Sequence, residues 1–155
     1  MKGTYTIIVD CRSEGSCVFG ELGRARLRKG LYLYTGSALG RGNASLERRL
    51  ERHARPSKKK WWHIDYLTSR PFCCVSGAVY IISTRRLECR VSRCISEELN
   101  VLPVLPRIGA SDCNCEGHLL GPDFRLGYAE LLQRLRKVYR RVGSGRLVVA
   151  APNSD

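Results

Sequence analysis

Residues 29–53 constrain the fold more than any other part of this sequence, because they join a short strand, a glycine-broken loop and an arginine-rich helix. The apolar and aromatic run at 31–34 predicts a strand, and Gly36 ends it. Gly40 and Gly42 indicate a flexible loop after the strand. The segment is therefore expected to pass from a sheet into a helix through an irregular loop.

The helix of this segment is expected to begin after Asn43 or Ser45, either of which can cap its first turn, and to end at His53. Residues four apart share a helix face, so Arg49 and His53 lie side by side next to the apolar stripe of the helix. The segment therefore predicts that Tyr34, Arg49 and His53 come close together over a polar cleft.

The rest of the chain predicts one α+β domain. At 155 residues the chain is long enough for a single core. Alternating apolar residues at 4–9 predict a strand, and the helical period at 128–142 predicts an amphipathic helix. The other expected elements are strands at 17–19, 24–27 and 73–82, helices at 62–68 and 84–99, and an extended or irregular segment at 101–108. We expect an α/β sandwich with a small central, mainly antiparallel sheet of three to four strands flanked by helices, in which Tyr34 lies near Tyr5.

Three short motifs resemble the signature of the GIY-YIG nuclease superfamily. Gly3-Thr4-Tyr5 stands in the place of the first motif, Tyr34-Thr35-Gly36 in the place of the second, and Arg49 in the place of the helix arginine. The spacing of Arg49 and His53 is similar to the pattern of that superfamily, in which an aromatic residue or histidine follows the arginine by four positions. The resemblance implies a GIY-YIG-like fold and nuclease activity.

Longer blocks resemble one branch of that superfamily, the Uri-type endonucleases, a group similar to the domain of unknown function 123. The resemblance runs from Gly3 to about Leu120 and implies a nuclease-like domain at 1–122. Outside the resemblance, residues 123–155 are expected to form an amphipathic helix and a flexible tail. In chain order the blocks are Tyr34-Thr35-Gly36-Ser37-Ala38, Trp62-His63-Ile64-Asp65-Tyr66-Leu67, Glu88-Cys89 and Ser111-Asp112-Cys113-Asn114-Cys115-Glu116-Gly117-His118-Leu119.

The balance of charge favours a polyanionic partner. The chain has 27 Lys and Arg against 14 Asp and Glu, which gives a net charge of +13. Each phosphate that such a chain neutralises releases counterions, so DNA is favoured over the alternative of an ordinary basic surface. No apolar run approaches the ~18 residues of a membrane span, and the N-terminus lacks the apolar segment of a signal peptide. A cytoplasmic protein without membrane contact is therefore expected.

The resemblance implies a site that hydrolyses phosphodiester bonds. It places one divalent ion, Mg²⁺ or Mn²⁺, on Glu88, assigns water and protons to Tyr5 and Tyr34, and places the scissile phosphate on Arg49. A single carboxylate suits Mg²⁺, which retains most of its water ligands. A guanidinium suits phosphate, because it donates paired hydrogen bonds in a fork.

Each of these residues also has a purely structural interpretation. The two tyrosines can be sheet aromatics, Arg49 can be one of several surface arginines, and Glu88 can be a favourable charge at a helix N-terminus. Glu97 and Glu98 are rival metal ligands, because they lie nearer to the proline-rich segment that follows the helix.

Two departures from the superfamily pattern concern the phosphate contact and the scaffold. Ser37 follows the second motif, where the superfamily often has lysine, and the asparagine that often ends the pattern has no clear counterpart. His53, or His63 together with Asp65, are candidates for replacing these groups, because histidine carries protons well near neutral pH. His63 can equally be structural, with its ring bonded to Asp65 or to a carbonyl.

A basic and aromatic run at 57–62 predicts contact with a nucleic-acid strand, because lysines contact phosphates and tryptophans stack on bases. The alternative is a solvated turn in which the tryptophans cover the core. The residues expected to contact nucleic acid are Ser37, Arg41, Lys58, Lys59, Lys60 and Trp61.

Eight cysteines are many for a reducing compartment. Buried thiols that behave as small apolar groups, disulfides and metal ligands are the three explanations. Cys113, Cys115 and His118 are donors of the types that bind zinc, with Cys89 or Cys94 as a fourth ligand. In the other interpretation these side chains pack inside the protein.

Three functions follow from these features. We prefer a metal-dependent endonuclease that acts on branched, nicked or single-stranded DNA in repair or processing, because both tyrosines, the arginine and a candidate glutamate are all present. The alternatives are a nucleic-acid-binding module of the same fold without turnover, and a zinc-stabilised adaptor for a protein partner.

Overall fold

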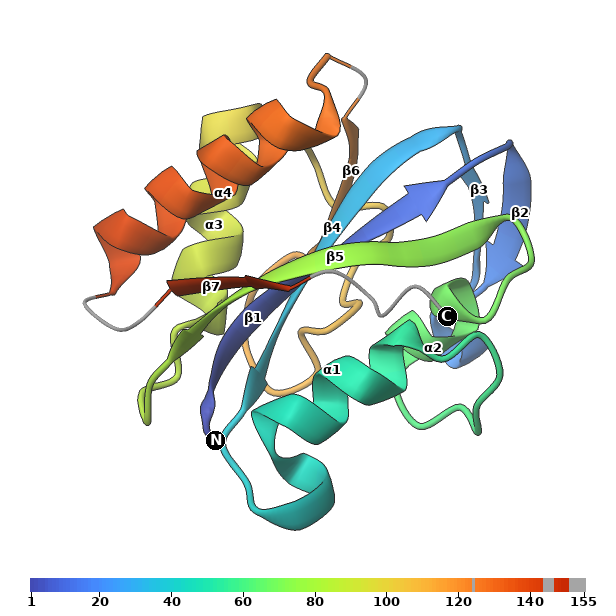
Figure 1. The fold of residues 1–155 in the computed structure, drawn as a ribbon. Coiled ribbons are helices and arrows are strands. Elements are labelled where there is room, and N and C mark those ends of the chain that lie inside the picture. Colours follow the sequence, from blue (N-terminus) through green and yellow to red (C-terminus); the bar gives the residue numbers. More distant parts are fainter. Residues whose placement is uncertain (124, 144–146, 151–155) are drawn as a thin grey trace.

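A central sheet lies between two layers of helices in the computed structural model, which describes residues 1–123, 125–143 and, for the backbone only, 147–150 (Figure 1). The strands β1 (Gly3–Cys11), β4 (Gly30–Ala38), β5 (Cys73–Ile82) and β6 (Leu119–Asp123) are antiparallel and lie in the order β6-β4-β1-β5. A further strand, β7 (Leu147–Ala150), pairs with the free edge of β5. The expected α+β class, with an antiparallel sheet flanked by helices, is confirmed.

The helices cover the two faces of the sheet in pairs (Figure 1). α1 (Leu46–Ala54) and α2 (His63–Thr68) pack on one face, and α3 (Glu88–Leu99) and α4 (Tyr128–Val142) pack on the other. The two short strands expected at 17–19 and 24–27 are β2 (Gly15–Val18) and β3 (Arg24–Leu27), which pair in a separate sheet. Single turns of 3₁₀-helix stand at η1 (Gly20–Leu22) and η2 (Gly42–Ala44). No described helix is long and apolar enough to cross a membrane.

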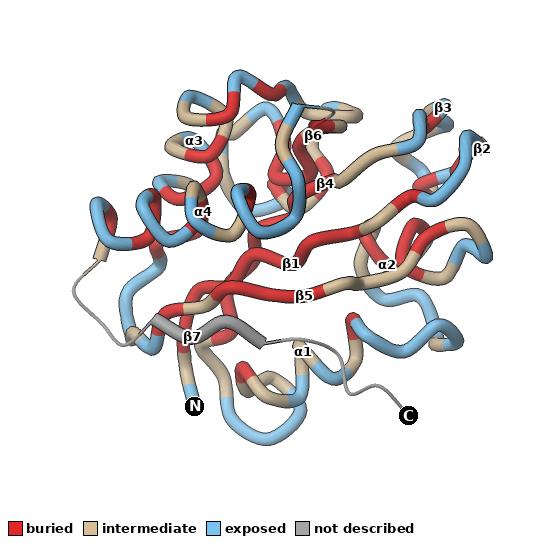
Figure 2. The backbone as a smooth tube through the Cα atoms, turned by 45° about the horizontal axis from the view of Figure 1, so that its top comes forward, coloured by how far each residue is buried: buried red, intermediate tan, exposed pale blue. Residues whose placement is uncertain are grey.

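Both faces of β1 are buried, and Figure 2 shows its tube as almost continuously buried between the helices. Successive side chains of a strand point to opposite faces. Ile7 therefore joins the core under α1 and α2, whereas Ile8 joins the core under α3 and α4. On the second face the Thr6 hydroxyl shares a hydrogen bond of 2.8 Å with the Tyr139 hydroxyl on α4. The sheet is thus held from both sides.

The start of α1 follows the expected capping rule. Of the two candidate caps, Ser45 is the one that acts, because its side chain accepts a hydrogen bond from the Arg48 N–H. α2 begins after Trp62, where the Asp65 carboxylate accepts hydrogen bonds of 2.9 Å from the N–H groups of Trp61 and Trp62. Both expected helices are confirmed to within a residue or two.

Four elements differ from the expectation. β4 does not end at Gly36 but continues to Ala38, because Gly36 pairs with Tyr5 inside the ladder with β1. α3 begins at Glu88 rather than near Thr84, because the chain first turns after β5, where the Ser83 hydroxyl accepts from the Arg85 N–H. β6 was not expected, because Gly121 and Pro122 interrupt its pattern. β7 lies within the expected flexible tail, whose other residues, 144–146 and 151–155, lie outside the described residues.

The expected division between residues 122 and 123 falls inside β6. The helix beyond it, α4, shares a buried cluster with α3 and the sheet, to which Leu131, Leu135 and Val138 contribute. Residues on both sides of the expected boundary therefore contribute to one core.

Candidate functional site

A pocket of about 490 Å³ gathers residues that are far apart in the sequence. Five of the expected catalytic or metal-binding residues line it, each from a different element. They are Tyr5 on β1, Tyr34 on β4, Arg49 on α1, His63 on α2 and Glu88 on α3. Two residues of the expected nucleic-acid surface, Ser37 and Trp61, also line the pocket.

The two tyrosine motifs fit together because a glycine lies opposite a tyrosine. In the antiparallel register Tyr5 pairs with Gly36. A Cβ atom at Gly36 would stand 2.7 Å from the Tyr5 hydroxyl oxygen, so only glycine lets this ring lie across β4. Gly109 has a similar role beside Tyr34: its φ is +74°, and a Cβ there would stand 2.8 Å from the Tyr34 ring.

His53 lies behind the tyrosines and does not line the pocket. Its Nε2 and the Tyr5 hydroxyl share a hydrogen bond of 2.8 Å, and its ring centre is 5.9 Å from that of Tyr34. Burial, with the charge of Lys58 nearby, lowers the pKa of His53 to about 3. The imidazole is therefore neutral at physiological pH and supports Tyr5.

Both tyrosines keep their protons. Burial raises the pKa of Tyr5 and the pKa of Tyr34 well above the ordinary value, and the positive charge of Arg49 opposes the rise only partly. The phenols therefore face the pocket as neutral hydroxyl groups, which can both donate and accept hydrogen bonds.

Arg49 differs from the surface arginine next to it. Its Nη1 donates to the Ser37 carbonyl, and its guanidinium lies 4.9 Å from the centre of the Trp62 ring. The buried Nε has no hydrogen-bond partner among the described residues. Arg48, by contrast, is exposed and pairs with Glu51 at 3.3 Å. Arg49 therefore presents a fixed positive charge with an unused donor.

Glu88 is the only one of the three candidate metal ligands that lines the pocket. Its carboxylate is largely buried, and it accepts a hydrogen bond of 2.9 Å from Arg86. Arg86 also bonds to Asp112 at 2.6 Å, so one exposed guanidinium bridges two carboxylates of the pocket wall. Of the two rivals, Glu98 pairs instead with basic residues of α4.

The Glu88 carboxylate fits a divalent cation by its chemistry. It is an oxygen donor held at the pocket wall, with the Asp112 carboxylate near it across Arg86. Hard cations such as Mg²⁺ prefer such oxygen donors.

The joint between α1 and α2 is built on Asp65. Its fully buried carboxylate pairs with Arg52 at 2.8 Å and accepts from the amides of Trp61 and Trp62. Burial raises the pKa of Asp65, but the hydrogen bonds from Arg52 and the two amides outweigh burial and lower it. These contacts all fall on Oδ2, and no hydrogen bond joins His63 to Asp65 among the described residues, so the alternative in which the His63 ring bonds to Asp65 is not the one observed.

The basic residues that were expected to contact nucleic acid differ in whether their side chains point into the protein or into solvent. Lys58 points inward, where its ammonium donates to the His53 carbonyl at 3.0 Å and to the Thr68 hydroxyl at 2.9 Å. Burial lowers the pKa of Lys58 to about 8. Arg41, Lys59 and Lys60 are exposed outside the pocket lining.

The two tryptophans of the run have different environments. Trp61 is 61% exposed, and the Arg52 guanidinium lies 4.5 Å from the centre of its ring. Trp62 is partly buried and packs against the core. One tryptophan thus supports the core, while the other offers an aromatic surface at the pocket.

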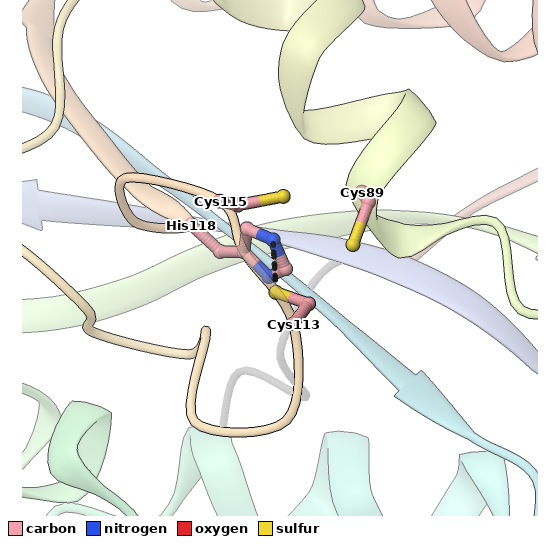
Figure 3. A group of neighbouring side chains, drawn as sticks. All are labelled: Cys89, Cys113, Cys115 and His118. Atoms are coloured by element: carbon pink, nitrogen blue, oxygen red, sulfur yellow. Dashed lines mark hydrogen bonds between the residues drawn. The ribbon is translucent and has the colours of Figure 1, made fainter.

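A second group of polar side chains lies at the start of α3 (Figure 3). The ligand atoms of Cys89, Cys113, Cys115 and His118 all lie within 4.8 Å of one another, which is close enough to hold a metal ion. Cys94, the alternative fourth ligand, does not belong to this group.

Three cysteines outside this group lie in the core. Cys11, Cys17 and Cys73 are buried, and the sulfurs of Cys11 and Cys73 share a hydrogen bond of 2.8 Å. All eight cysteines are free of disulfide bonds in the structure. These three side chains are therefore part of the core.

Sequence reasoning missed part of the pocket wall. Arg86, Gly109 and Asp112 line the pocket, but none was assigned to the site. Asp112 stands in the Ser111–Leu119 block, which was a usable signal. Arg86 gave no signal, because nothing in its local pattern separates it from the other arginines.

Searches of curated proteins and of solved structures return no match to this chain. A family model matches residues 4–143, a range that covers the sheet from β1 to β6, the four described α-helices and both groups of side chains described above. The chain therefore belongs to the family described as the domain of unknown function DUF123.

Proposed function

We propose that this protein is a metal-dependent endonuclease that hydrolyses phosphodiester bonds of DNA, in the manner of the GIY-YIG nucleases it resembles. One observation carries the proposal: two phenols, a guanidinium and a carboxylate, from four separate elements, line the same pocket. Phosphodiester hydrolysis needs a group to direct water, a cation for the phosphate and help for the leaving oxygen. The four side chains supply groups for each of these needs.

Arg49 is the proposed phosphate ligand. Its contact with Ser37 and its stacking on Trp62 fix the guanidinium, which leaves the buried Nε without a partner in the described chain. Arg49 lines the pocket, so its fixed guanidinium would attract a non-bridging phosphate oxygen there. Because the guanidinium is already held in place, little side-chain entropy is lost when phosphate binds.

Tyr5 and Tyr34 are proposed to position water and relay protons. Their raised pKa values keep both hydroxyls protonated at neutral pH, so they act through hydrogen bonds rather than as phenolates. The Tyr5–His53 hydrogen bond fixes one of the two hydroxyls. His63 lies on the same wall and is the proposed proton carrier nearest the exterior.

Glu88 is the proposed ligand for Mg²⁺ or Mn²⁺, with Asp112 as a second carboxylate nearby. Bound there, the cation would neutralise charge on the phosphate. In the structure the Arg86 guanidinium pairs with the Glu88 carboxylate. More than half of the Arg86 side chain is exposed, so breaking this ion pair to admit a cation would cost little free energy.

The rim of the pocket favours DNA with unpaired nucleotides. Trp61 offers an exposed ring that is backed by Arg52, and base stacking on such rings does not depend on sequence. Lys59 and Lys60 precede this ring, and Arg41 directly follows Gly40, which lines the pocket. Branched, nicked or single-stranded DNA would expose a base to Trp61 while the basic residues contact phosphates.

Cleavage of labelled nicked and branched DNA with and without Mg²⁺ tests this proposal. We expect Arg49→Ala and Tyr34→Phe to slow cleavage by about 10²–10³-fold, the usual loss when one group that stabilises a transition state is removed. Arg48→Ala is the matched control, because Arg48 is the exposed neighbour of Arg49. Equal rates in all four preparations would assign the cleavage to a contaminant.

Binding measured separately distinguishes the alternative of a module without turnover. With a net charge of +13, DNA affinity is expected to fall steeply as salt increases, because phosphate contacts release counterions. Binding without Mg²⁺-dependent cleavage would favour the binding module. Affinity that does not respond to salt would remove nucleic acid as the partner.

A further inference from the structure

The group at Cys89, Cys113, Cys115 and His118 stands apart from the proposed reaction, because none of its members lines the larger pocket. Three thiols and an imidazole are a donor set that favours zinc over magnesium. We infer that these four side chains bind one zinc ion, which joins the loop at 107–118 to the first turn of α3 and so fixes the acidic wall of the pocket.

The distances fit a tetrahedral zinc ion. Zinc bonds of ~2.3 Å to sulfur and ~2.0–2.1 Å to nitrogen place neighbouring ligand atoms ~3.6–3.8 Å apart. The Cys113 sulfur and the His118 Nε2 are already 3.8 Å apart, and every pair in the group lies within 4.8 Å (Figure 3). Movements of about 1 Å by side chains would complete the tetrahedron.

His118 supports the assignment independently of these distances. Its ring is fully buried, and the hydrogen-bond partner of its Nε2 among the described residues is the Cys113 sulfur. A thiol is a weak hydrogen-bond partner, and buried polar groups of proteins are nearly always well satisfied. A zinc ion bound to Nε2 would give this nitrogen a strong partner.

The surrounding backbone is already shaped for such a site. The Arg107 guanidinium donates to the carbonyls of Cys113 and Cys115 at 2.6 Å and 3.1 Å, which holds the turn that carries both thiols. Zinc with three thiolates has a net charge of −1, and Arg107 offsets it. A second pocket of about 440 Å³ is lined by the three cysteines, so a metal ion can reach the sulfurs.

The proposed zinc site adjoins the proposed active site through the chain itself. Glu88 directly precedes Cys89, and Asp112 directly precedes Cys113. Arg86 bridges the same two carboxylates, which line the larger pocket. Zinc would therefore hold the backbone on both sides of this bridge. Only this last consequence rests on the proposed nuclease function.

Metal content of the purified full chain tests the site. We expect about one zinc per chain in the wild type after expression with added zinc. Cys89→Ser and Cys113→Ser should each lower zinc affinity at least ~10-fold, the smallest loss usual even for residues that only support metal ligands. Cys94→Ser is the matched control, because Cys94 lies on the same helix outside the group, and it should retain zinc.

Cobalt provides a second readout that does not depend on the folding of any variant. Wild-type protein stripped of zinc and titrated with Co²⁺ should show the strong visible bands and the thiolate charge-transfer bands of tetrahedral cobalt. Wild type with neither bound zinc nor these bands would overturn the site, as would a loss of zinc in Cys94→Ser equal to that in Cys89→Ser. No DNA is present, so either result leaves the proposed cleavage to be judged by its own assay.

Discussion

At the scale of single residues, the pocket depends on one close approach between two strands. Tyr5 lies opposite Gly36, and its ring fills the space that a side chain at position 36 would need. The sequence contained this relationship as two short motifs, but their contact follows only from the register of β1 and β4. Tyr5, Tyr34 and Arg49 were therefore predictable as a group, whereas the position of His53 behind Tyr5 was not.

Gly36→Ala is expected to destabilise the protein. Replacing a strand glycine by alanine gains about 0.5–1 kcal/mol, but overpacking a filled core costs about 1–3 kcal/mol. The second effect wins here, because a Cβ would stand 2.7 Å from a buried hydroxyl that is itself bonded to His53. Urea unfolding measures the difference. Gly127→Ala, where no heavy atom lies within 4 Å of the added Cβ, should have a smaller effect. Equal urea midpoints for the wild type and Gly36→Ala would contradict the close approach.

His53 makes stability depend on pH. Its pKa falls from 6.5 in the unfolded chain to about 3 in the folded protein, so the unfolded chain binds more protons between these values. His53 therefore contributes full stability above pH 6.5 and loses about 1.4 kcal/mol for each pH unit below it, until pH approaches 3. Urea midpoints measured between pH 7 and pH 4.5 should fall less steeply in His53→Gln. Parallel curves would show that His53 is not buried as described.

At the scale of elements, the joint between α1 and α2 positions one side of the pocket. Arg52 from α1 meets Asp65 from α2, and the same carboxylate caps α2 at Trp61 and Trp62. The sequence predicted both helices, because their apolar spacing and caps are local signals. It did not predict the Arg52–Asp65 pair, because an ion pair between two helices depends on how they pack.

Asp65→Ala is expected to destabilise the protein by about 3–5 kcal/mol, the usual cost of removing one partner of a buried ion pair. The loss is large because Arg52 and two backbone amides lose their acceptor together. Glu51→Ala, which breaks the exposed pair with Arg48, should cost no more than ~1 kcal/mol. Thermal or urea unfolding compares the two variants. Similar small losses would mean that Asp65 does not hold the joint.

The element boundaries that differed share a physical cause. α3 begins where the turn after β5 ends, and this turn is set by the Ser83 contact rather than by a capping residue at Thr84. β6 is a strand because β4 offers a free edge, although Gly121 and Pro122 weaken its own pattern. In both places tertiary contacts decided what local sequence did not.

At the scale of the whole molecule, the pocket forms where the two helical layers meet one end of the sheet. Arg49 comes from the layer of α1 and α2, Glu88 comes from the layer of α3 and α4, and the tyrosines come from the sheet between them. The two cores on opposite faces of β1 hold these layers in a fixed relation. Local sequence patterns predict most of the individual helices and strands. The pocket itself forms only when both helical layers pack against the sheet.

The proposed active site is tested most directly by the Mg²⁺-dependent rate of single-turnover DNA cleavage in Glu88→Gln and Glu97→Gln. Both residues are glutamates of α3, but of the two only Glu88 lines the pocket. The two variants therefore remove the same charge from the same helix and differ in whether the charge faces the pocket. We predict that Glu88→Gln loses at least ~100-fold in rate and that Glu97→Gln cleaves like the wild type. Equal rates in the two variants, or a wild-type rate that does not change with Mg²⁺, would contradict the proposed site.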